Sequence, residues 1–362
     1  MKSKIRYLFL VILAIALFTS CEEEIDFENM DVKERVYSVM KHWYYWDKEI
    51  PDDIDLSQYS SGKDLMDDLK YSEIDRWSYV GDASDYDQYY NQGLYSGFGY
   101  GIKFDQNSDL RISFVYTESP MYKTGARRGW KFITEPIIES GERKFQMLNL
   151  NNDTVKFSAI PATVVINTVL HKEVISEGGK EIGYLVFKNF LETSEVELEE
   201  AFTLFENNNI SELIVDLRYN GGGRVRLAGF LGGKILPQNI SEIPFVSYTY
   251  NKKQARNNST WSINKTGNLN LKRVIIITSK STASASELLI NGLKPYMDVV
   301  LIGEDATYGK PVGSFGIVQN GYVISAISFK VSNANSIGNY FDGFNPDVYR
   351  NDGLDKPFGD RE

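Results

Sequence analysis

Residues 212–236 read ELIVDLRYNGGGRVRLAGFLGGKIL and decide how the second half of the chain is expected to fold. The apolar run ELIVDLR predicts a buried strand. Three consecutive glycines at residues 221–223 then allow the backbone to turn tightly. The pattern from Val225 to Leu236 is typical of a helix. The stretch therefore predicts a strand, a glycine loop and a helix in direct succession.

The same alternation continues on both sides of this unit. Apolar runs with strand character occur in GYLVFKNF, RVIIITS and DVVLIGE, and helical patterns lie at residues 194–207 and 287–295. Strands of this kind that alternate with helices are typical of α/β layers around a mostly parallel sheet. Active groups in such folds lie in loops at the strand ends. We therefore expect the chemistry of this protein in those loops.

The first half of the chain has two different patterns. Residues 31–89 look helical, and Pro51 with the aspartates after it ends the first helical stretch. Five apolar residues of that stretch fall near one face: Val36, Val39, Met40, Trp43 and Trp46. Residues 95–159 contain glycine-punctuated stretches such as SGFGYGIKF, which predict strands. The sequence thus predicts a small helical region followed by a β-rich region.

The first 21 residues have the pattern of a targeting segment. Lys2, Lys4 and Arg6 precede an uninterrupted run of twelve apolar residues at 7–18. Because a membrane-spanning helix needs about 20 residues, a signal peptide fits this run better. Small residues and then Cys21 follow, an arrangement that resembles a bacterial lipoprotein processing site. It implies a lipid on Cys21 and a place in the cell envelope, at a membrane surface; ordinary secretion with an incidental cysteine is the alternative.

Composition excludes several classes of site. The formal net charge of −10 makes nucleic acid a poor partner, because phosphate binding needs clustered Lys and Arg. Cys21 is the sole cysteine, so an intramolecular disulfide is impossible. His42 and His171 are the only histidines, too few for a zinc site of the usual kind. We therefore expect neither a metal nor a cofactor.

The glycine loop, DLRYNGGG at residues 216–223, offers bare backbone N–H groups. Such groups suit an oxyanion hole. A phosphate-binding loop would continue with Lys and then Ser or Thr, whereas Arg224 and Val225 follow here. A tight strand-to-helix turn without chemistry is the alternative interpretation.

A second loop, STASASE at residues 281–287, places serines at the start of a predicted helix. A nucleophilic Ser284 would gain from the positive end of the helix dipole, which favours developing negative charge. Its neighbours Ala283 and Ala285 are small and leave room for a carbonyl group. The same residues also fit a capping box, in which Ser284 caps the helix and Glu287 reaches back. The local pattern alone favours capping.

A third loop, TYGKP at residues 307–311, supplies a lysine. A serine nucleophile needs a base, and histidine is scarce in this chain. Burial disfavours the charged ammonium group and lowers the pKa of a lysine towards neutrality. Ser–Lys pairs are a known variant of the catalytic triad. We hypothesise that Lys310 is uncharged in the working protein and takes the proton of Ser284.

DLRYNGGG, STASASE and TYGK, in this order, resemble the signature segments of the C-terminal processing, or tail-specific, serine protease family. YGIKF and SPMYKTGARRGW are similar to parts of the PDZ domain that precedes the catalytic domain in that family. The resemblance implies an α+β multi-domain protein whose catalytic layers are similar to those of crotonase and Clp. It implies four segments: a lipoprotein signal peptide at 1–21, a linker and helical region at 22–90, a PDZ-like domain at 91–165 and an α/β peptidase domain at 166–362.

At the matching positions, the resemblance implies that Ser284 is the nucleophile and Lys310 the general base. The backbone N–H groups of Ala285 and of Gly222 or Gly223 would form the oxyanion hole. Three further residues match supporting positions: Glu287, Thr307 and Ser314. Ser314 stands where the family often has a glutamine that orients the lysine, so what holds Lys310 stays open.

The resemblance implies a serine endopeptidase without a cofactor that cleaves exported or unfolded protein segments. The PDZ-like domain would recruit them by adding an extended peptide to a sheet edge. A catalytically silent, peptide-binding lipoprotein is one alternative. An esterase is another, although the Gly-x-Ser-x-Gly pattern does not surround Ser284.

Overall fold

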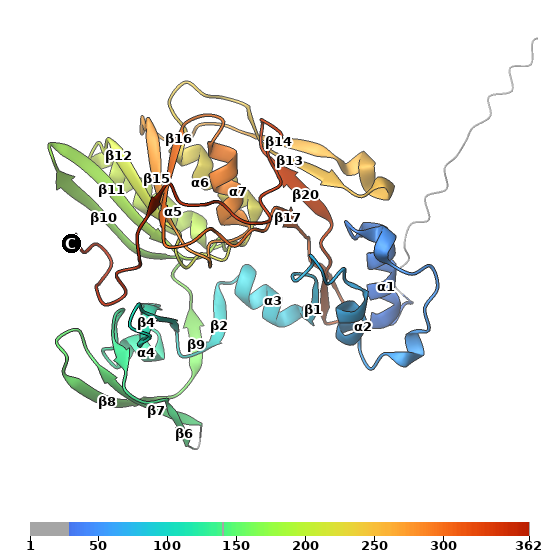
Figure 1. The fold of residues 1–362 in the computed structure, drawn as a ribbon, viewed down its shortest axis with the longest axis horizontal. Coiled ribbons are helices and arrows are strands. Elements are labelled where there is room, and N and C mark those ends of the chain that lie inside the picture. The colour runs from blue at the N-terminus through green and yellow to red at the C-terminus, as the bar shows by residue number, and fades with distance from the viewer. Residues whose placement is uncertain (1–28, 140, 362) are drawn as a thin grey trace, which may run out of the picture.

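The computed structural model describes residues 29–139 and 141–361, so the predicted signal peptide and Cys21 lie outside the described residues. Figure 1 shows a layered upper part, a β-rich lobe below it and a helical N-terminal lobe beside that, with α3 between the two lower lobes. The mixed α/β architecture and the small helical N-terminal region confirm the predicted fold class.

The N-terminal lobe begins with a capped helix. The lobe contains α1 (Val32–Trp43), η1 (Asp47–Glu49), η2 (Leu56–Gln58), α2 (Gly62–Leu69) and β1 (Tyr79–Asp82), and α3 (Ala83–Tyr90) leads from it towards the β-rich lobe. The Asp31 carboxylate accepts hydrogen bonds from the N–H groups of Lys33 and Glu34, which satisfies donors that the first helical turn leaves free. Helix α1 buries Val36 and Val39, two residues of the predicted apolar face.

Strand β1 departs from the helical pattern expected for residues 31–89. It pairs in an antiparallel manner with β19 (Tyr322–Ser325), so that Val80 lies opposite Ile324. Ile324 and Ile327 also pack into the core of the N-terminal lobe, together with residues of α1 and α2. The lobe is therefore built partly from the far end of the chain, and this contact brings its loops to the layered part.

The β-rich lobe has its own small core. Its elements are β2 (Leu94–Gly97), β3 (Tyr100–Phe104), β4 (Leu110–Val115), α4 (Pro120–Lys123), β5 (Lys131–Phe132), β6 (Ile137–Glu139), β7 (Glu142–Leu148), β8 (Thr154–Ala159) and β9 (Ala162–Val165). Ile112, Met121 and Met147 are fully buried between the sheet and α4. Strand β3 lies at one edge of the sheet, and the antiparallel pair β2–β9 joins the lobe to the rest of the chain.

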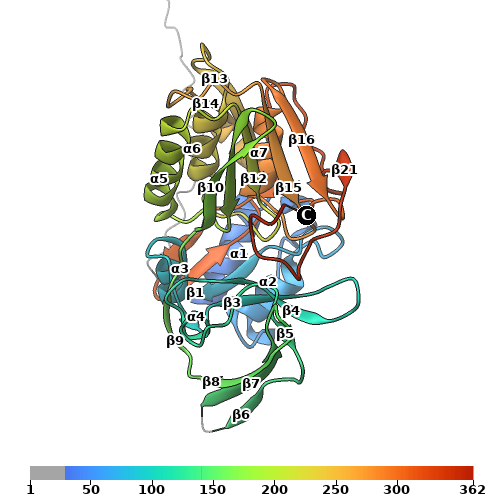
Figure 2. The same cartoon turned by 90° about the vertical axis from the view of Figure 1, so that its left-hand side faces the viewer.

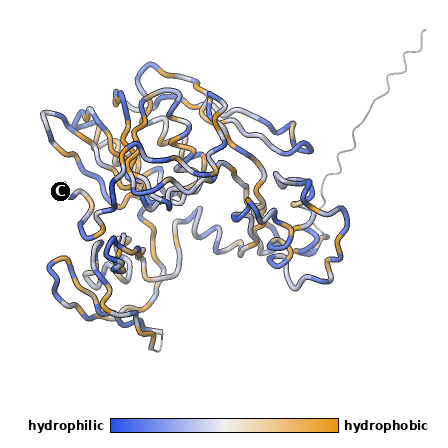
Figure 3. The backbone as a smooth tube through the Cα atoms, in the orientation of Figure 1, coloured by the Kyte–Doolittle hydropathy of each residue, from blue (hydrophilic) through white to orange (hydrophobic). Residues whose placement is uncertain are grey.

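The layered part is built around a six-stranded sheet. Its strands, in spatial order, are β10 (Val169–Glu177), β11 (Lys180–Phe187), β12 (Glu212–Asp216), β15 (Arg273–Thr278), β16 (Asp298–Gly303) and β21 (Val348–Tyr349). All neighbouring pairs are parallel except β10–β11, which confirms the mostly parallel sheet. Figure 3 shows hydrophobic stretches in the central strands of this part.

Helices cover one face of this sheet. They are α5 (Ser194–Asn207), α6 (Val225–Ile235) and α7 (Ala285–Leu293), and Figure 2 shows α5 and α6 on one side of the strands with the C-terminal end of the chain on the other. Leu213, Val215 and Ile276 point to the helices and are fully buried in the largest core cluster. Because the carboxyl ends of parallel strands meet at one sheet edge, the loops after β12, β15 and β16 are brought together there.

Two smaller sheets complete the fold. One contains β14 (Ser259–Ile263), β13 (Ile243–Tyr250), β20 (Phe329–Ser332) and β17 (Val312–Gly313), and the other joins β18 (Ile317–Gln319) to β19 and β1. A 3-10 helix, η3 (Lys252–Asn257), connects β13 to β14. Among the described residues, no helix is both long and apolar enough to cross a bilayer.

Candidate active site

Ser284 lies on a tight turn between β15 and α7. Its φ of 57° and ψ of −114° belong to a region that favours glycine and costs a residue with a side chain about 1–3 kcal/mol. The surrounding structure holds this turn. The Ala283 N–H and the Ser286 hydroxyl both donate to the carbonyl oxygen of Asn220, over 3.1 and 3.0 Å. The serine turn and the glycine loop are therefore joined by direct hydrogen bonds.

Glu287 joins the serine turn to the lysine loop. Its side chain is fully buried and accepts four hydrogen bonds: from the Ser284 N–H (3.0 Å), the Thr307 hydroxyl (2.6 Å), the Gly309 N–H (2.7 Å) and the Lys310 N–H (2.9 Å). Burial raises the pKa of this carboxyl above its ordinary value, and the hydrogen bonds oppose that shift. Glu287 thus reaches back to Ser284 as the capping box predicts, and it also fixes the position of the lysine.

Lys310 and Ser284 line the same cleft, which has a volume of about 670 Å³. Burial lowers the pKa of Lys310 to about 8, although the nearby carboxylates of Asp75 and Glu287 act in the opposite direction. The Lys310 Nζ lies 5.7 Å from the centre of the Trp77 ring. The pKa of Lys310 is therefore much closer to neutrality than that of an exposed lysine, which favours the uncharged form that a general base requires.

Trp77 reaches this cleft from the N-terminal lobe, and Asp75 lies behind it, near enough to act on the pKa of Lys310; no role was predicted for either residue. The buried Asp75 carboxylate accepts hydrogen bonds from the Tyr44 hydroxyl (2.7 Å) and the Trp77 N–H (2.9 Å), and from both the N–H and the hydroxyl of Ser78. The local pattern is only that of an aspartate that binds its own backbone in a turn. This local pattern does not predict that Asp75 lies near Lys310, which follows far along the chain.

Ser314 also lines the cleft, but its hydroxyl pairs with another serine. The Ser314 Oγ lies 2.7 Å from the Oγ of Ser325, a residue of β19. The contacts found around Lys310 are instead with Trp77, Asp75 and Glu287. These three residues come from two lobes of the molecule.

Two glycines of the glycine loop, Gly221 and Gly223, line the cleft. The Gly222 N–H donates to the Asn220 side-chain oxygen over 2.9 Å and is therefore occupied. Within the described parts of the chain, the Gly223 N–H has no acceptor, and Gly223 lines the cleft. The Ala285 N–H is at the first position of α7, where a helix provides no internal acceptor. Ala285 and Gly223 thus have the two free donors that an oxyanion hole needs.

Gly222 packs directly against the serine turn. A Cβ atom at this position would lie 2.8 Å from the Cβ of Ser284 and 2.9 Å from the N atom of Ala285, and its φ of 99° also favours glycine. Gly221 is a matched control, because a Cβ there would meet nothing within 4 Å. We expect Gly222→Ala to displace the turn, to destabilise the fold by about 1–3 kcal/mol and to abolish hydrolysis, and Gly221→Ala to have little effect on either. Urea unfolding and peptide turnover of both variants test this; equal activity of the two would contradict it.

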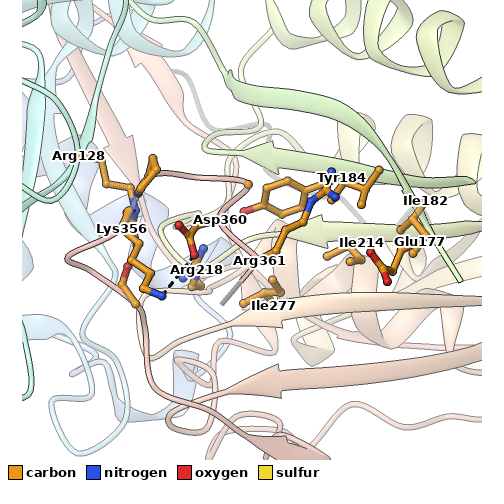
Figure 4. A pocket seen from close by; sticks show the side chains of 14 residues that line it. Arg128, Glu177, Ile182, Tyr184, Ile214, Arg218, Ile277, Lys356, Asp360 and Arg361 are labelled. Carbon is orange, nitrogen blue, oxygen red and sulfur yellow. Dashed lines mark hydrogen bonds and ion pairs between the residues drawn. The ribbon is translucent and has the colours of Figure 1, made fainter. Parts of the chain in front are cut away.

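A second cavity, of about 440 Å³, lies on the sheet face that the helices leave open. Its apolar floor consists of Ile182, Ile214 and Ile277, and Arg128 and Arg218 stand at its side (Figure 4). Neither Ser284 nor Lys310 lines it. This cavity is therefore separate from the candidate active site.

Beside this cavity, a buried network holds the start of the glycine loop. Arg128 of the β-rich lobe donates to the Tyr219 hydroxyl (2.6 Å) and to Asp352 (2.7 Å), and Arg218 pairs with both Asp216 and Asp352 at 2.5 Å. Burial acts to raise the pKa of Asp352, but the two arginines lower it to about 2. The start of the glycine loop is thus held in place by the interactions of Asp216, Arg218 and Tyr219.

No group of three or more His, Cys, Asp or Glu side chains suited to a metal ion occurs among residues 29–139 and 141–361. The site described above consists of a serine, a lysine and backbone N–H groups, with a buried glutamate between the loops.

Comparison with known proteins agrees with this arrangement. Residues 31–79 match the peptidase S41 N-terminal domain, and residues 181–349 match peptidase family S41. A carboxyl-terminal-processing protease of Synechocystis sp. is 26% identical over 194 residues, which are 53% of this chain and 40% of that protein. The chain spans less than half of the length of the curated relatives it matches.

Solved structures show the same fold. A protein of Bacteroides fragilis described as an S41 protease has a TM-score of 0.75 and 24% identity, and the match covers 90% of this chain and 93% of that one. The photosystem II D1 C-terminal processing protease has a TM-score of 0.58 and 17% identity, over 88% and 92% of the two chains. The two family matches together cover more than half of the chain, and they include both the helical lobe and the sheet with its serine and lysine loops. The chain belongs to peptidase family S41.

Proposed function

We propose that this protein is a serine endopeptidase of the C-terminal processing type, with Ser284 as nucleophile and Lys310 as general base. One observation carries the proposal: a serine on a turn that favours glycine and a half-buried lysine of lowered pKa line one cleft. Glu287 holds the backbone of both residues by hydrogen bonds and so fixes their loops relative to each other. This combination is what a Ser–Lys hydrolase requires.

The reaction follows from these groups. Uncharged Lys310 takes the proton of Ser284 as the serine oxygen adds to the peptide carbonyl carbon. The N–H groups of Gly223 and Ala285 stabilise the oxyanion that forms. The lysine ammonium then gives its proton to the leaving amine as the C–N bond breaks, which leaves an acyl-enzyme. Lys310 next takes a proton from water, the resulting hydroxide attacks the ester, and Ser284 recovers its proton.

Substrates are exported or unfolded protein segments that enter the cleft in an extended form. Two of the proteins named above are C-terminal processing proteases, one of them for the photosystem II D1 protein. Residues 91–165 act as a PDZ-like domain that recruits the segment. Strand β3 supports this role, because it lies at a sheet edge where Ile102 and Phe104 are exposed and where a peptide strand could pair.

A lipid on Cys21 holds the protein at a membrane surface in the cell envelope. The sequence pattern at residues 2–21 supports this part of the proposal. Intact-mass measurement of the protein from membranes, compared with Cys21→Ser, tests it. An acyl modification on the parent alone is expected, and an unmodified cysteine in membrane-derived protein would contradict it.

The function itself is tested with the full chain and an unfolded protein, beside Ser284→Ala. Peptide products from the parent and none from the variant are expected. Binding of peptides by both chains with no products from either would instead indicate a silent peptide-binding lipoprotein. Turnover of a small ester without peptide cleavage would indicate an esterase. Either of these two results contradicts the proposal.

A further inference from the structure

The charged side chains that line the cleft around Ser284 are basic, although the protein as a whole is acidic. Arg224 and Lys310 line it, and neither aspartate nor glutamate does so in the described part of the chain. The net charge of the chain is −10. Eight of the remaining lining residues are aromatic: Trp77, Tyr79, Tyr86, Tyr90, Tyr248, Tyr250, Phe315 and Phe329. Lys310 gives up its charge to act as a base, so Arg224 is the one permanent charge of the cleft wall.

Arg224 lies beside the glycine loop and forms no ion pair within the described residues; the Asp87 carboxylate interacts with it only at longer range. It follows Gly223, and its guanidinium donates to the Tyr86 hydroxyl (3.1 Å) and to the Asn91 side-chain oxygen (2.5 Å). The Arg224 Nε is shielded from water and has no hydrogen-bond partner among the described residues. A guanidinium has five N–H donors, so these two bonds leave three unused.

The next arginine of the same helix is different. Arg226 forms ion pairs with Glu192 and Glu195, at 2.5 and 2.6 Å, on the protein surface. No carboxylate lies within ion-pair distance of Arg224 in the described residues. A partly buried guanidinium that lines a cleft, with N–H donors unused and with hydrogen bonds to neutral groups only, is a site for an anion.

We propose that Arg224 binds a carboxylate of the substrate close to the scissile bond, an inference that rests on the proposed peptidase function. Gly222 packs against Ser284. Arg224 is two residues further along the chain, so the Cα atoms of Gly222 and Arg224 are at most about 7 Å apart. An extended peptide advances about 3.3 Å per residue. The bound carboxylate therefore lies within a few residues of the cleaved bond, and aromatic walls beside it suit apolar neighbours.

Two kinds of substrate present such a carboxylate: a peptide with an acidic side chain and a peptide with its free C-terminus near the cut. Both would meet the guanidinium with charge-assisted hydrogen bonds. A purely structural role is the competing explanation, because Arg224 connects α3 to the glycine loop through Tyr86 and Asn91. A structural role predicts the same loss for every substrate, whereas a carboxylate subsite predicts a loss only for charged ones.

The test uses matched peptides and the full chain. One pair differs by Glu or Gln near the cleavage site and is amidated at its end; the other pair lacks acidic side chains and differs by a free or amidated C-terminus. We expect the parent to favour the charged member of at least one pair by roughly ten- to hundred-fold in kcat/KM. Arg224→Gln should remove that preference and leave the neutral peptide within about two-fold. Arg226→Gln is the matched control and should keep the preference.

The pair that shows the preference identifies the source, a side chain or a chain end. No preference in the parent for either pair, or an equal loss for charged and neutral peptides in Arg224→Gln, would overturn the subsite. If the parent cleaves no peptide, the proposed function fails and the subsite is still tested by binding. Ser284→Ala should then bind the charged peptides more tightly than the neutral ones, and addition of Arg224→Gln should abolish the difference; equal binding would overturn the inference.

Discussion

Replacing Ser284 by alanine or Lys310 by methionine is expected to lower kcat/KM by at least about 10⁴-fold in each case, and the double variant should be no worse than either single variant. The two side chains perform one proton transfer, so the first replacement already removes the whole effect. Peptide turnover by the three variants measures this. Losses that multiply in the double variant would show two independent contributions and would contradict the pair.

The same lysine variant gives a second signature in the stability of the fold. Burial lowers the Lys310 pKa from its ordinary 10.5 to about 8, so the unfolded chain binds more protons than the folded one between these values. The free energy of unfolding of the parent therefore rises with pH across this window, by roughly 3 kcal/mol from this group. Lys310→Met lacks that contribution. Urea unfolding of both chains at pH 7.5 and 10.5 measures how much the free energy of unfolding changes with pH in each, and the difference between the two changes is the contribution of Lys310. Equal pH dependence would mean that the lysine is exposed and charged.

Replacing Glu287 by alanine is expected to cost on the order of 4 kcal/mol in the free energy of unfolding and to abolish hydrolysis. The change leaves four buried donors without an acceptor, among them the N–H groups of Ser284 and Lys310. The serine turn and the lysine loop would then lose their common support.

Glu195→Ala is the matched control for this variant. Glu195 is an exposed glutamate whose ion pair with Arg226 lies on the surface, where such pairs are worth about 0–1 kcal/mol. Urea unfolding and turnover of both variants should separate them clearly. Normal activity in Glu287→Ala would contradict the account of how the two loops are held.

The parts of the fold that depend on local pattern could be predicted from the sequence. Helix α5 has the predicted bounds, Ser194 to Asn207, because its apolar residues recur with helical spacing. Strands β12, β15 and β16 lie where continuous apolar runs occur, and the mostly parallel sheet follows from their alternation with helices. The serine and lysine loops follow these strands, so the topology itself brings them to one sheet edge.

The parts that depend on distant contacts could not be predicted in this way. Residues 79–82 form a strand because β19 pairs with them, and the local sequence pattern does not predict this pairing. The approach of Asp75 and Trp77 to Lys310 has the same origin. For the oxyanion hole, the sequence did not distinguish Gly222 from Gly223. The two differ in the structure because the Asn220 side chain accepts a hydrogen bond from the Gly222 N–H.

The central claim is that uncharged Lys310 activates Ser284 in one cleft. The most direct measurement is the rate at which a serine-directed fluorophosphonate modifies the folded protein between pH 6 and 10, with the modified residue located by mass spectrometry, in the parent and in Lys310→Met. We predict a single adduct on Ser284 whose rate of formation rises with pH through a midpoint near 8, and a slow, pH-independent rate in the variant. Modification of a different residue, or the same rate and pH profile in the variant, would contradict the claim.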